Sequence, residues 1–275
     1  MLKDQTFAFI GSGAMGEAMI KGLITSASLP PQQIMASDTR SERGAELHDK
    51  YGVRYTTDNL AAVNGAKIIV LSVKPQVLHS VMTQLAGCVA PDALVLSIVA
   101  GARMEVIINV LQHKAVVRAM PNTPAQIGLG MTVWTCPETL SQVHRDQTKA
   151  VFGSIGEEVY ANDERYLDMA TALSGTGPAY VFLFMEAMID AGVHMGFSRA
   201  VAEQLVYQTV RGSVEYARQN KQHLAAMRNQ VTSPGGTSAE ALYQIEKGGL
   251  RTVLSRAIWA AYQKSRKLGR GVEED

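Results

Sequence analysis

The most informative stretch of the sequence is Phe7-Ala-Phe-Ile-Gly-Ser-Gly-Ala-Met-Gly16. Its first four residues are all apolar, which is typical of a strand covered on both faces of a sheet. The glycines then follow the spacing G-x-G-x-x-G, and a helical segment begins directly afterwards at Glu17. In that context Gly11 allows a tight turn, Gly13 lets the backbone approach a pyrophosphate, and Gly16 lets helix and strand pack closely. The stretch predicts a dinucleotide-binding loop and disfavours an ordinary glycine turn.

Short apolar runs alternate with helical segments from this stretch to about Tyr160. Such alternation is typical of a parallel sheet with crossover helices. The expected strands are Thr6–Ile10, Gln33–Ser37, Lys67–Ser72, Ala93–Ser97 and Ala115–Ala119. We therefore predict a Rossmann-like, doubly wound α/β domain over residues 1–162.

Strand signals end near Asn162, and long segments with helical spacing take over. These segments are Pro178–His194, Ser198–Asn220, Ser238–Lys247 and Gly249–Lys267. The first is apolar around most of its circumference and needs cover on several sides, which a domain of about 110 residues cannot easily provide alone. We predict an all-α domain over residues 163–275 that mediates dimerisation.

The composition is that of a globular protein, with 47% apolar residues, 19% charged residues and a formal net charge of +1. Such a balance gives no overall field for a polyanion, so we expect no nucleic-acid partner. The longest apolar runs fall short of the roughly 20 residues of a membrane span, and Lys3 and Asp4 leave no room for a signal peptide. We expect a cytoplasmic protein without a membrane partner. Cys88, Cys136 and the six histidines show no metal-ligand spacing, so no metal is expected.

The end of the second expected strand carries conflicting signals about the cofactor. Asp38 follows Gly16 by about 20 residues, where an acid binds the ribose hydroxyls of NAD. Arg40 and Arg43 follow at once, and guanidinium groups could hold the 2′-phosphate of NADP. Asp38 could also be a simple turn residue. The residues leave NADPH and NADH both open.

Two further segments suit ligands. Ser72-Val-Lys-Pro75 closes the third expected strand, at the carboxyl edge where open α/β sheets bind ligands, although Lys74 could be a solvated loop lysine. Ser233-Pro-Gly-Gly-Thr-Ser238 precedes a helix, whose free N–H groups could bind a carboxylate. The pattern Thr237-x-x-Glu240 also fits a capping box, so the loop could serve as a helix cap.

Together these residues resemble the pyrroline-5-carboxylate reductase family, and the resemblance covers almost the whole chain. The motifs that carry it are the glycine loop, Val73-Lys-Pro75, Arg118-Ala-Met-Pro-Asn-Thr-Pro124, Ser174-Gly-Thr-Gly-Pro-Ala-Tyr180, Glu186-Ala-Met-Ile-Asp-Ala-Gly192 and Ser233-Pro-Gly-Gly-Thr237. The resemblance implies a Rossmann domain followed by a helical domain that interlocks with its twin. It also implies dimers that can stack into larger rings, and reduction of the cyclic imine 1-pyrroline-5-carboxylate to L-proline.

The resemblance also implies roles for particular residues. Ser238 is the expected catalytic residue, because the family has a hydroxyl there that hydrogen-bonds the ring nitrogen. The expected substrate-binding residues are Thr176, Gly177, Ser233, Gly235, Gly236, Thr237 and Ser238. The expected cofactor-binding residues are Gly11, Ser12, Gly13, Ala14, Met15, Gly16, Asp38, Arg40, Asn59, Ser72, Val73, Lys74 and Pro75.

The chain departs from the family pattern at several positions. Ser238 stands where relatives usually carry threonine, and an acid at Asp38 is uncommon among them. Leu224, Arg228 and Asn229 replace a proline, a lysine and an aspartate before the Ser-Pro-Gly-Gly loop.

Two other functions compete with the reductase. A hydroxyacid dehydrogenase would need a catalytic lysine on a helix of the second domain. None of the candidates is well placed for it, namely Lys221, Lys247 and Lys264. A protein that binds a dinucleotide without turning it over is the other alternative, which the intact loop at Ser233 disfavours.

Overall fold

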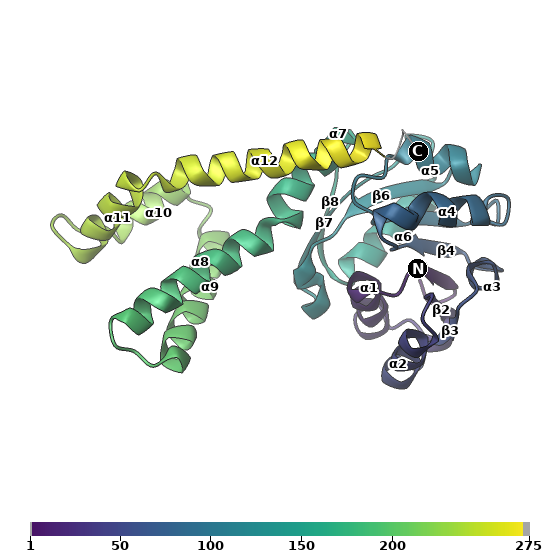
Figure 1. The fold of residues 1–275 in the computed structure, drawn as a ribbon, viewed down its shortest axis with the longest axis horizontal. Coiled ribbons are helices and arrows are strands. Elements are labelled where there is room, and N and C mark those ends of the chain that lie inside the picture. Colours follow the sequence, from purple (N-terminus) through teal and green to yellow (C-terminus); the bar gives the residue numbers. More distant parts are fainter. Residues whose placement is uncertain (1, 272–275) are drawn as a thin grey trace. The chain divides into compact units, whose positions relative to one another are not determined.

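A computed structural model describes residues 2–271, with side chains placed as far as residue 269. Contacts divide the chain into two compact units, whose elements are labelled in Figure 1. The first unit comprises the chain up to Thr176 together with the segment from Ala261 onward, and the second comprises Gly177–Ala260. As a domain boundary, the division between residues 162 and 163 stays a prediction.

The first unit is built on an eight-stranded sheet with the order β3-β2-β1-β4-β5-β6-β7-β8. All neighbouring strands run parallel except β6 and β7. The strands are β1 Phe7–Ile10, β2 Ile34–Ser37, β3 Arg54–Thr56, β4 Ile68–Leu71, β5 Leu94–Ser97, β6 Val116–Met120, β7 Gly130–Thr135 and β8 Gly156–Tyr160. The expected Rossmann-like class is confirmed, and the five expected strands are β1, β2, β4, β5 and β6.

Helices cover both faces of this sheet. They are α1 Ala14–Thr25, α2 Ser41–Tyr51, α3 Asn59–Val63, α4 Pro75–Leu85, α5 Met104–Leu111, α6 Gln142–Gly153 and α7 Arg165–Ala170, with short turns η1 Pro31–Gln33, η2 Thr123–Ile127 and η3 Thr171–Gly175. Strand β1 shows the two-sided burial directly, because Phe7 and Phe9 belong to one apolar cluster while Ala8 and Ile10 belong to the other. The unbroken apolar run of β1 therefore reflects a central strand.

The order of the strands sets the position of a ligand crevice. Strand β1 lies between β2 and β4, so the chain's crossovers pass to opposite sides of the sheet there. In open α/β sheets this reversal opens a crevice at the carboxyl ends of the strands. The glycine loop follows β1 at that point.

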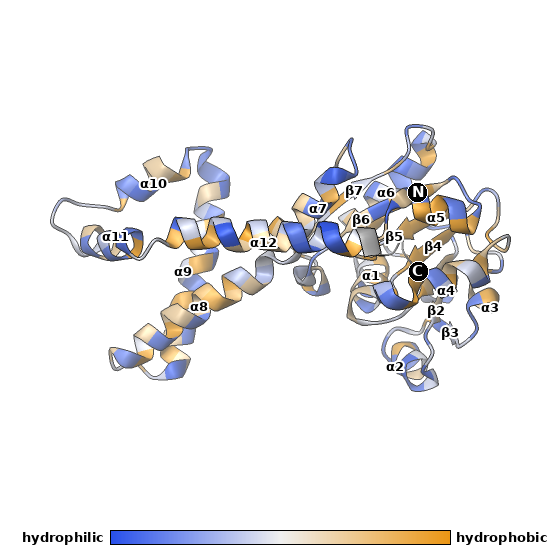
Figure 2. Cartoon of the chain, turned by 45° about the horizontal axis from the view of Figure 1, so that its top comes forward, coloured by the Kyte–Doolittle hydropathy of each residue, from blue (hydrophilic) through white to orange (hydrophobic). Residues whose placement is uncertain are grey.

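The second unit is all helix. Its elements are α8 Gly177–His194, α9 Arg199–Asn220, α10 Leu224–Gln230, α11 Thr237–Lys247 and the first part of α12, which runs Leu250–Gly271. Its buried apolar cluster consists of Ile189, Ala202 and Val206, with a few half-buried neighbours. The ribbon of α8 is coloured mostly hydrophobic in Figure 2, and Phe182 and Leu183 are 60% and 66% exposed. The unit thus leaves much of its apolar surface uncovered within one chain.

One helical stretch, Arg165–His194, is long and apolar enough to cross a membrane by length and composition. Only 11% of its most apolar window is buried within the chain. The expectation that every apolar run falls short of a span is wrong by this criterion, because Glu186 and Asp190 interrupt the run only sparsely. A soluble core helix meets the same criterion, so this evidence for a membrane is weak.

Candidate active site

Two glycines of the loop after β1 lie where no side chain fits. Gly11 has a φ of +89°, and a Cβ there would lie 2.8 Å from the carbonyl oxygen of Ser72. A Cβ on Gly16 would lie 2.9 Å from the carbonyl oxygen of Gly11. Backbone atoms cannot yield cheaply, so both positions require glycine.

Gly13 has the opposite surroundings. It is the N-cap of α1, and a Cβ on it would meet no atom of the described chain within 4 Å. Over residues 2–271 no side chain caps this helix, so the N–H groups of its first turn, those of Ala14 and Met15 among them, have no capping side chain. An uncapped helix N-terminus with room beside it suits a phosphate group. The loop therefore fits the pyrophosphate of a dinucleotide.

Hydrogen bonds hold this loop on the ends of its neighbouring strands. The Ser12 hydroxyl, which is buried, donates to the carbonyl of Ser37 at 3.0 Å, and the Gly11 N–H donates to the same oxygen at 2.9 Å. On the other side the Ser72 hydroxyl donates to the carbonyl of Gly11. These bonds fix the loop before any ligand arrives.

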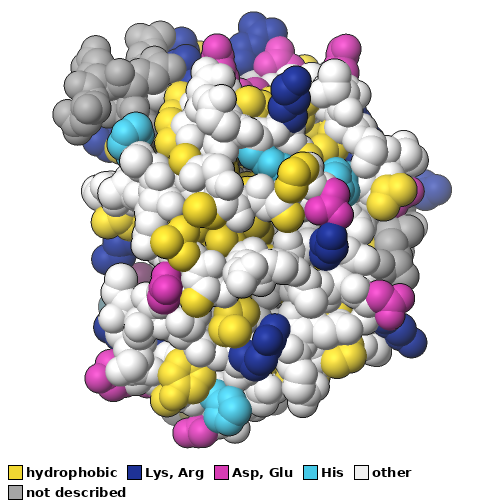
Figure 3. Space-filling view, turned by 90° about the vertical axis from the view of Figure 1, so that its right-hand side faces the viewer, with side chains coloured by type: hydrophobic (Ala, Val, Ile, Leu, Met, Phe, Trp, Pro, Cys, Tyr) yellow, Lys and Arg dark blue, Asp and Glu magenta, His cyan; other side chains and the backbone are white. Residues whose placement is uncertain are grey.

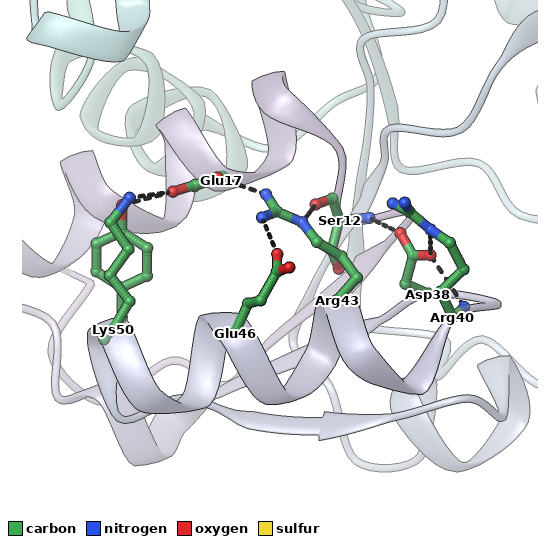
Figure 4. A network of polar contacts seen from close by, with 8 residues as sticks. Ser12, Glu17, Asp38, Arg40, Arg43, Glu46 and Lys50 are labelled. Carbon is green, nitrogen blue, oxygen red and sulfur yellow. Dashed lines mark hydrogen bonds and ion pairs between the residues drawn. The ribbon is translucent and has the colours of Figure 1, made fainter.

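Asp38 and Asn59 gather at the end of β2. Asp38 Oδ2 accepts the Ser12 N–H at 3.3 Å, and its Oδ1 accepts the Arg40 N–H at 3.1 Å. The Ser37 hydroxyl donates to Asn59 Oδ1 at 2.7 Å. Asp38 is therefore a turn residue and at the same time a neighbour of the glycine loop, where Figure 4 shows it beside Ser12.

Arg43, on α2, is engaged elsewhere. Its Nε donates to the carbonyl of Ser12 at 2.8 Å, and its other nitrogens pair with Glu17 and with Glu46, the latter at 3.0 Å. Lys50 completes the group by pairing with Glu17 at 2.7 Å.

The surroundings of Glu17 determine its charge. Partial burial opposes ionisation, but hydrogen bonds from Lys50, Arg43 and Tyr51 outweigh it and lower the pKa of Glu17 from 4.5 to about 2. The carboxylate is therefore ionised at neutral pH and holds both cations against α1.

The segment after β4 supplies a second open helix start at this edge of the sheet. Lys74 is the N-cap of α4 and Pro75 occupies its first turn, while Val73 is half-buried beside Gly11. Lys74 is exposed, and no side chain in the described part of the chain caps α4. The backbone of Lys74 lies at the edge of the sheet where ligands bind. Its exposed side chain fits the alternative of a solvated loop lysine.

Asn122, in the loop after β6, holds the segment that carries Thr176. Its Nδ2 donates to the carbonyl of Ser174 at 3.1 Å, and its Oδ1 accepts the Met131 N–H at 2.8 Å. The segment Thr171–Gly175 is a π-helical turn, a feature often found at functional sites. The sequence did not predict this link, which joins residues 52 positions apart.

In the second unit, the loop Ser233–Ser238 leads into α11. Gly235 has a φ of +70°, and the N-cap of α11 is Gly236, whose N–H donates to the Ser233 carbonyl at 3.0 Å. Thr237 is the first helical residue, and within residues 2–271 no side chain caps this end. The expected capping box does not form. The N–H groups of Thr237 and Ser238 are those that a helix start leaves without an intrahelical partner.

Comparisons of the sequence with family models and with known proteins all point to one family. Residues 164–268 match the family model "Pyrroline-5-carboxylate reductase dimerisation", and residues 6–101 match "NADP oxidoreductase coenzyme F420-dependent". A pyrroline-5-carboxylate reductase from Synechocystis is 39% identical over 261 residues, which cover 95% of this chain and 97% of that protein. The enzyme of this name from Escherichia coli is 35% identical, with 97% and 99% coverage. The chain belongs to the pyrroline-5-carboxylate reductase family.

Solved structures agree with this family. A pyrroline carboxylate reductase from Plasmodium falciparum, solved with NADP bound, superposes with a TM-score of 0.89 at 29% identity, covering 97% of this chain and 99% of that one. A prephenate dehydrogenase from Aquifex aeolicus, at 15% identity and a TM-score of 0.55, shares the fold alone. The reductase described here thus carries an oxidoreductase domain that takes NADPH or NADH, followed by the family's dimerisation domain.

The reductase fold brings the expected cofactor residues together around the carboxyl ends of β1, β2 and β4. The expected substrate residues fall in two places along the chain: Thr176 ends the first unit, Gly177 begins the second, and the Ser233–Ser238 loop lies within the second. Thr176 turns its hydroxyl to the Thr171 carbonyl at 2.8 Å.

Proposed function

We propose that this protein reduces 1-pyrroline-5-carboxylate to L-proline with NADPH or NADH, the last step of proline biosynthesis. The single observation that carries the proposal is the uncapped start of α11 after the Ser233-Pro-Gly-Gly loop, within the region matched by the family's dimerisation model. An oxidoreductase whose second domain offers open N–H groups suits a substrate that carries a carboxylate.

The reaction needs little acid–base chemistry from the chain. When bound, the cofactor supplies a hydride, which adds to the imine carbon while the carbon–nitrogen π electrons move to the nitrogen. The nitrogen keeps its proton and becomes the secondary amine of proline. Because the protonated imine is already an electrophile, the chain's main tasks are to orient the ring and exclude water.

We assign the substrate's carboxylate to the loop before α11. The backbone N–H groups of Gly235, Thr237 and Ser238 would bind it at the positive end of the helix. The N–H of Gly236 donates to the Ser233 carbonyl, so Gly236 would shape the loop around the carboxylate. The Ser238 hydroxyl would hold the ring nitrogen and its proton, which makes it the proposed catalytic residue. Thr176, Gly177 and Ser233 are the remaining proposed substrate residues.

The cofactor would lie along the carboxyl edge of the sheet. Its pyrophosphate would bind the open N-terminus of α1 through Gly11 to Gly16, and its adenosine ribose would face Asp38, Arg40 and Asn59. The segment Ser72–Pro75 would line the edge next to β4.

The proposed partners are small molecules and further copies of the chain. The dimerisation domain provides for self-association, and we propose that dimers assemble further into a ring. We propose that a second copy rather than lipid covers α8, in a cytoplasmic protein. On the face shown in Figure 3, Lys and Arg side chains are interspersed with Asp and Glu, which is unlike the basic patch of a nucleic-acid binder.

The experiment that tests the proposal follows NADH and NADPH oxidation by the purified protein with two imines. One is pyrroline-5-carboxylate and the other is 1-pyrroline, which lacks the carboxylate. We expect kcat/KM to fall by about 10-fold or more without the carboxylate, the scale of one charge-assisted hydrogen bond. Equal rates would contradict the assigned role of the loop. Turnover of hydroxyacids instead would favour the dehydrogenase alternative.

A further inference from the structure

The groups around the end of β2 bear on which cofactor this chain prefers. NADP differs from NAD by a phosphate on the 2′ oxygen of the adenosine ribose, which carries a charge of about −1.5 to −2 near neutral pH. Discrimination therefore depends on which charged side chains are free at that position. Asp38, Arg40 and Arg43 are the candidates.

Asp38 is a fixed acceptor. Its side chain is only 13% exposed and is held by the N–H groups of Ser12 and Arg40. Oδ1 also accepts from Arg40 Nε, whereas among the described residues Oδ2 accepts only the Ser12 N–H and keeps a lone pair for a ribose hydroxyl. A 2′-phosphate at the same place would meet a like charge that cannot move away.

Arg43 cannot supply the compensating charge. Three acceptors occupy it, namely the Ser12 carbonyl, Glu17 and Glu46, and its side chain is only 16% exposed. Figure 4 shows its guanidinium on the far side of Ser12 from Asp38, turned toward the two glutamates. With Lys50 also paired to Glu17, this group contains two cations and two anions and has no net charge to offer.

Arg40 is the remaining cation among these candidates, and it is poorly suited to bind a 2′-phosphate. Its side chain is 67% exposed, and its Nε already lies 3.4 Å from Asp38 Oδ1. Glu42 adds a negative charge in the first turn of α2. A 2′-phosphate would thus meet one mobile guanidinium that is shared with a carboxylate.

We propose that this chain prefers NADH, with Asp38 as the specificity-determining residue and Arg43 as a positioning residue that ties the glycine loop to α1 and α2. The inference rests on the proposed function for its physiological meaning, because it concerns the hydride donor of that reaction. It is tested by cofactor binding, which requires no substrate.

The test is calorimetric titration of the whole protein with NADH and with NADPH. We expect NADH to bind about 10- to 100-fold more tightly, the scale of one or two charge-assisted hydrogen bonds. Asp38→Asn keeps the shape of the side chain and removes its charge, so it should weaken NADH by about 10-fold and strengthen NADPH, bringing the two affinities close together.

Arg43→Gln is the matched comparison. It should weaken both cofactors by similar factors, because Arg43 supports the loop that binds the part common to both. Arg40→Gln should lower NADPH affinity alone. Tighter binding of NADPH by the unaltered protein, or a selective loss of NADPH binding in Arg43→Gln, would overturn the inference. Binding of NADH without reduction of the imine would leave the inference standing and contradict the proposed function.

Discussion

A single hydroxyl is the smallest feature on which the proposed chemistry depends. Ser238 lies in the first turn of α11, half-buried, next to the uncapped N-cap Gly236. In the proposed mechanism it has two functions, because its N–H would bind the substrate's carboxylate and its hydroxyl would hold the ring nitrogen. These functions can be separated by substitution.

Replacing Ser238 with alanine removes the hydroxyl and keeps the N–H. We expect Ser238→Ala to lower kcat/KM for pyrroline-5-carboxylate by roughly 10- to 1,000-fold, the scale of losing one proton-holding or positioning group. Ser238→Thr restores the hydroxyl and should retain most of the activity. Steady-state kinetics measure both, with NADH affinity as the control for folding. Full activity in Ser238→Ala would remove the hydroxyl from the mechanism.

Glu17 makes a prediction about stability and pH. Its pKa is lowered in the folded chain, so its contribution to the free energy of unfolding is present above pH 4.5 and is lost as the pH falls toward 2. The contribution is at most about 3 kcal/mol, and less because the site is partly solvated. The difference in thermal midpoint between the unaltered protein and Glu17→Gln should therefore be largest at neutral pH and shrink over that window.

Asp92→Asn is the control for Glu17→Gln. Asp92 forms an exposed ion pair with Lys67 at 2.6 Å, and such pairs contribute little to stability. Its loss should leave the thermal midpoint nearly unchanged. A difference for Glu17→Gln that did not vary between pH 7 and pH 2 would contradict the ionic role of Glu17.

Among the strands, those that are completely buried could be predicted from the sequence. Strands β1, β4 and β5 are buried at every position and read as continuous apolar runs, so they could be predicted. Strands β3 and β8 are the two edge strands of the sheet and are mostly exposed. Glu157 and Glu158 lie in β8, and neither strand is a continuous apolar run. Helix α10 has only seven residues, about two turns, which is too few for a clear helical period.

Some features of the candidate site could likewise be predicted from the sequence, and others could not. The gathering of the glycine loop, Asp38 and Ser72 could be predicted, because parallel strands end at a common edge. Two features could not be predicted, namely the link from Asn122 to Ser174 and the engagement of Arg43 by two glutamates. Both depend on side chains brought together by tertiary packing, and no local pattern in the sequence records that packing.

The last turns of α12 pack on the loop after β5, within the first unit. Gly101, in that loop, has a φ of +76°, and a Cβ on it would lie 3.2 Å from the backbone nitrogen of Gly269. Nearby, the Ser265 hydroxyl donates to Asp168 at 2.8 Å, and Asp168 lies 3.7 Å from the buried Arg118. Backbone approaches backbone at Gly101, so this contact leaves little room for a side chain.

Gly101→Ala tests that contact, with Gly65→Ala as its match. Gly65 also has a positive φ, of +73°, but a Cβ there would meet nothing within 4 Å. Both variants carry the backbone strain of about 1 kcal/mol, and only Gly101→Ala adds the steric conflict. We expect the thermal midpoint of Gly101→Ala to fall further, by a few degrees. Equal midpoints would show that α12 does not press on this loop.

At the scale of the whole molecule, the second unit cannot account for its own stability within one chain. Its buried cluster is small, while α8 exposes consecutive apolar side chains from Val181 to Phe184. The sequence predicted this need for cover from the all-round apolar pattern of α8. The dimerisation family model over residues 164–268 agrees with it.

Leu183→Glu places a charge on that surface. We expect it to convert the dimer to monomers and to lower reductase activity sharply, because burial of an unpaired charge opposes association. Light scattering coupled to gel filtration measures the oligomeric state. Lys149→Glu, an exposed change of charge on α6, should leave the assembly intact. An unaltered dimer in Leu183→Glu would place the interface elsewhere.

The proposed reaction is hydride transfer to a cyclic imine, and isotope labelling measures that step directly. The protein is incubated with pyrroline-5-carboxylate and with NADH that carries deuterium at the transferred position of nicotinamide C4. We expect L-proline one mass unit heavier, with the deuterium on the ring carbon that formed the imine. Unlabelled proline, or no proline from protein that binds the cofactor, would contradict the proposed reaction.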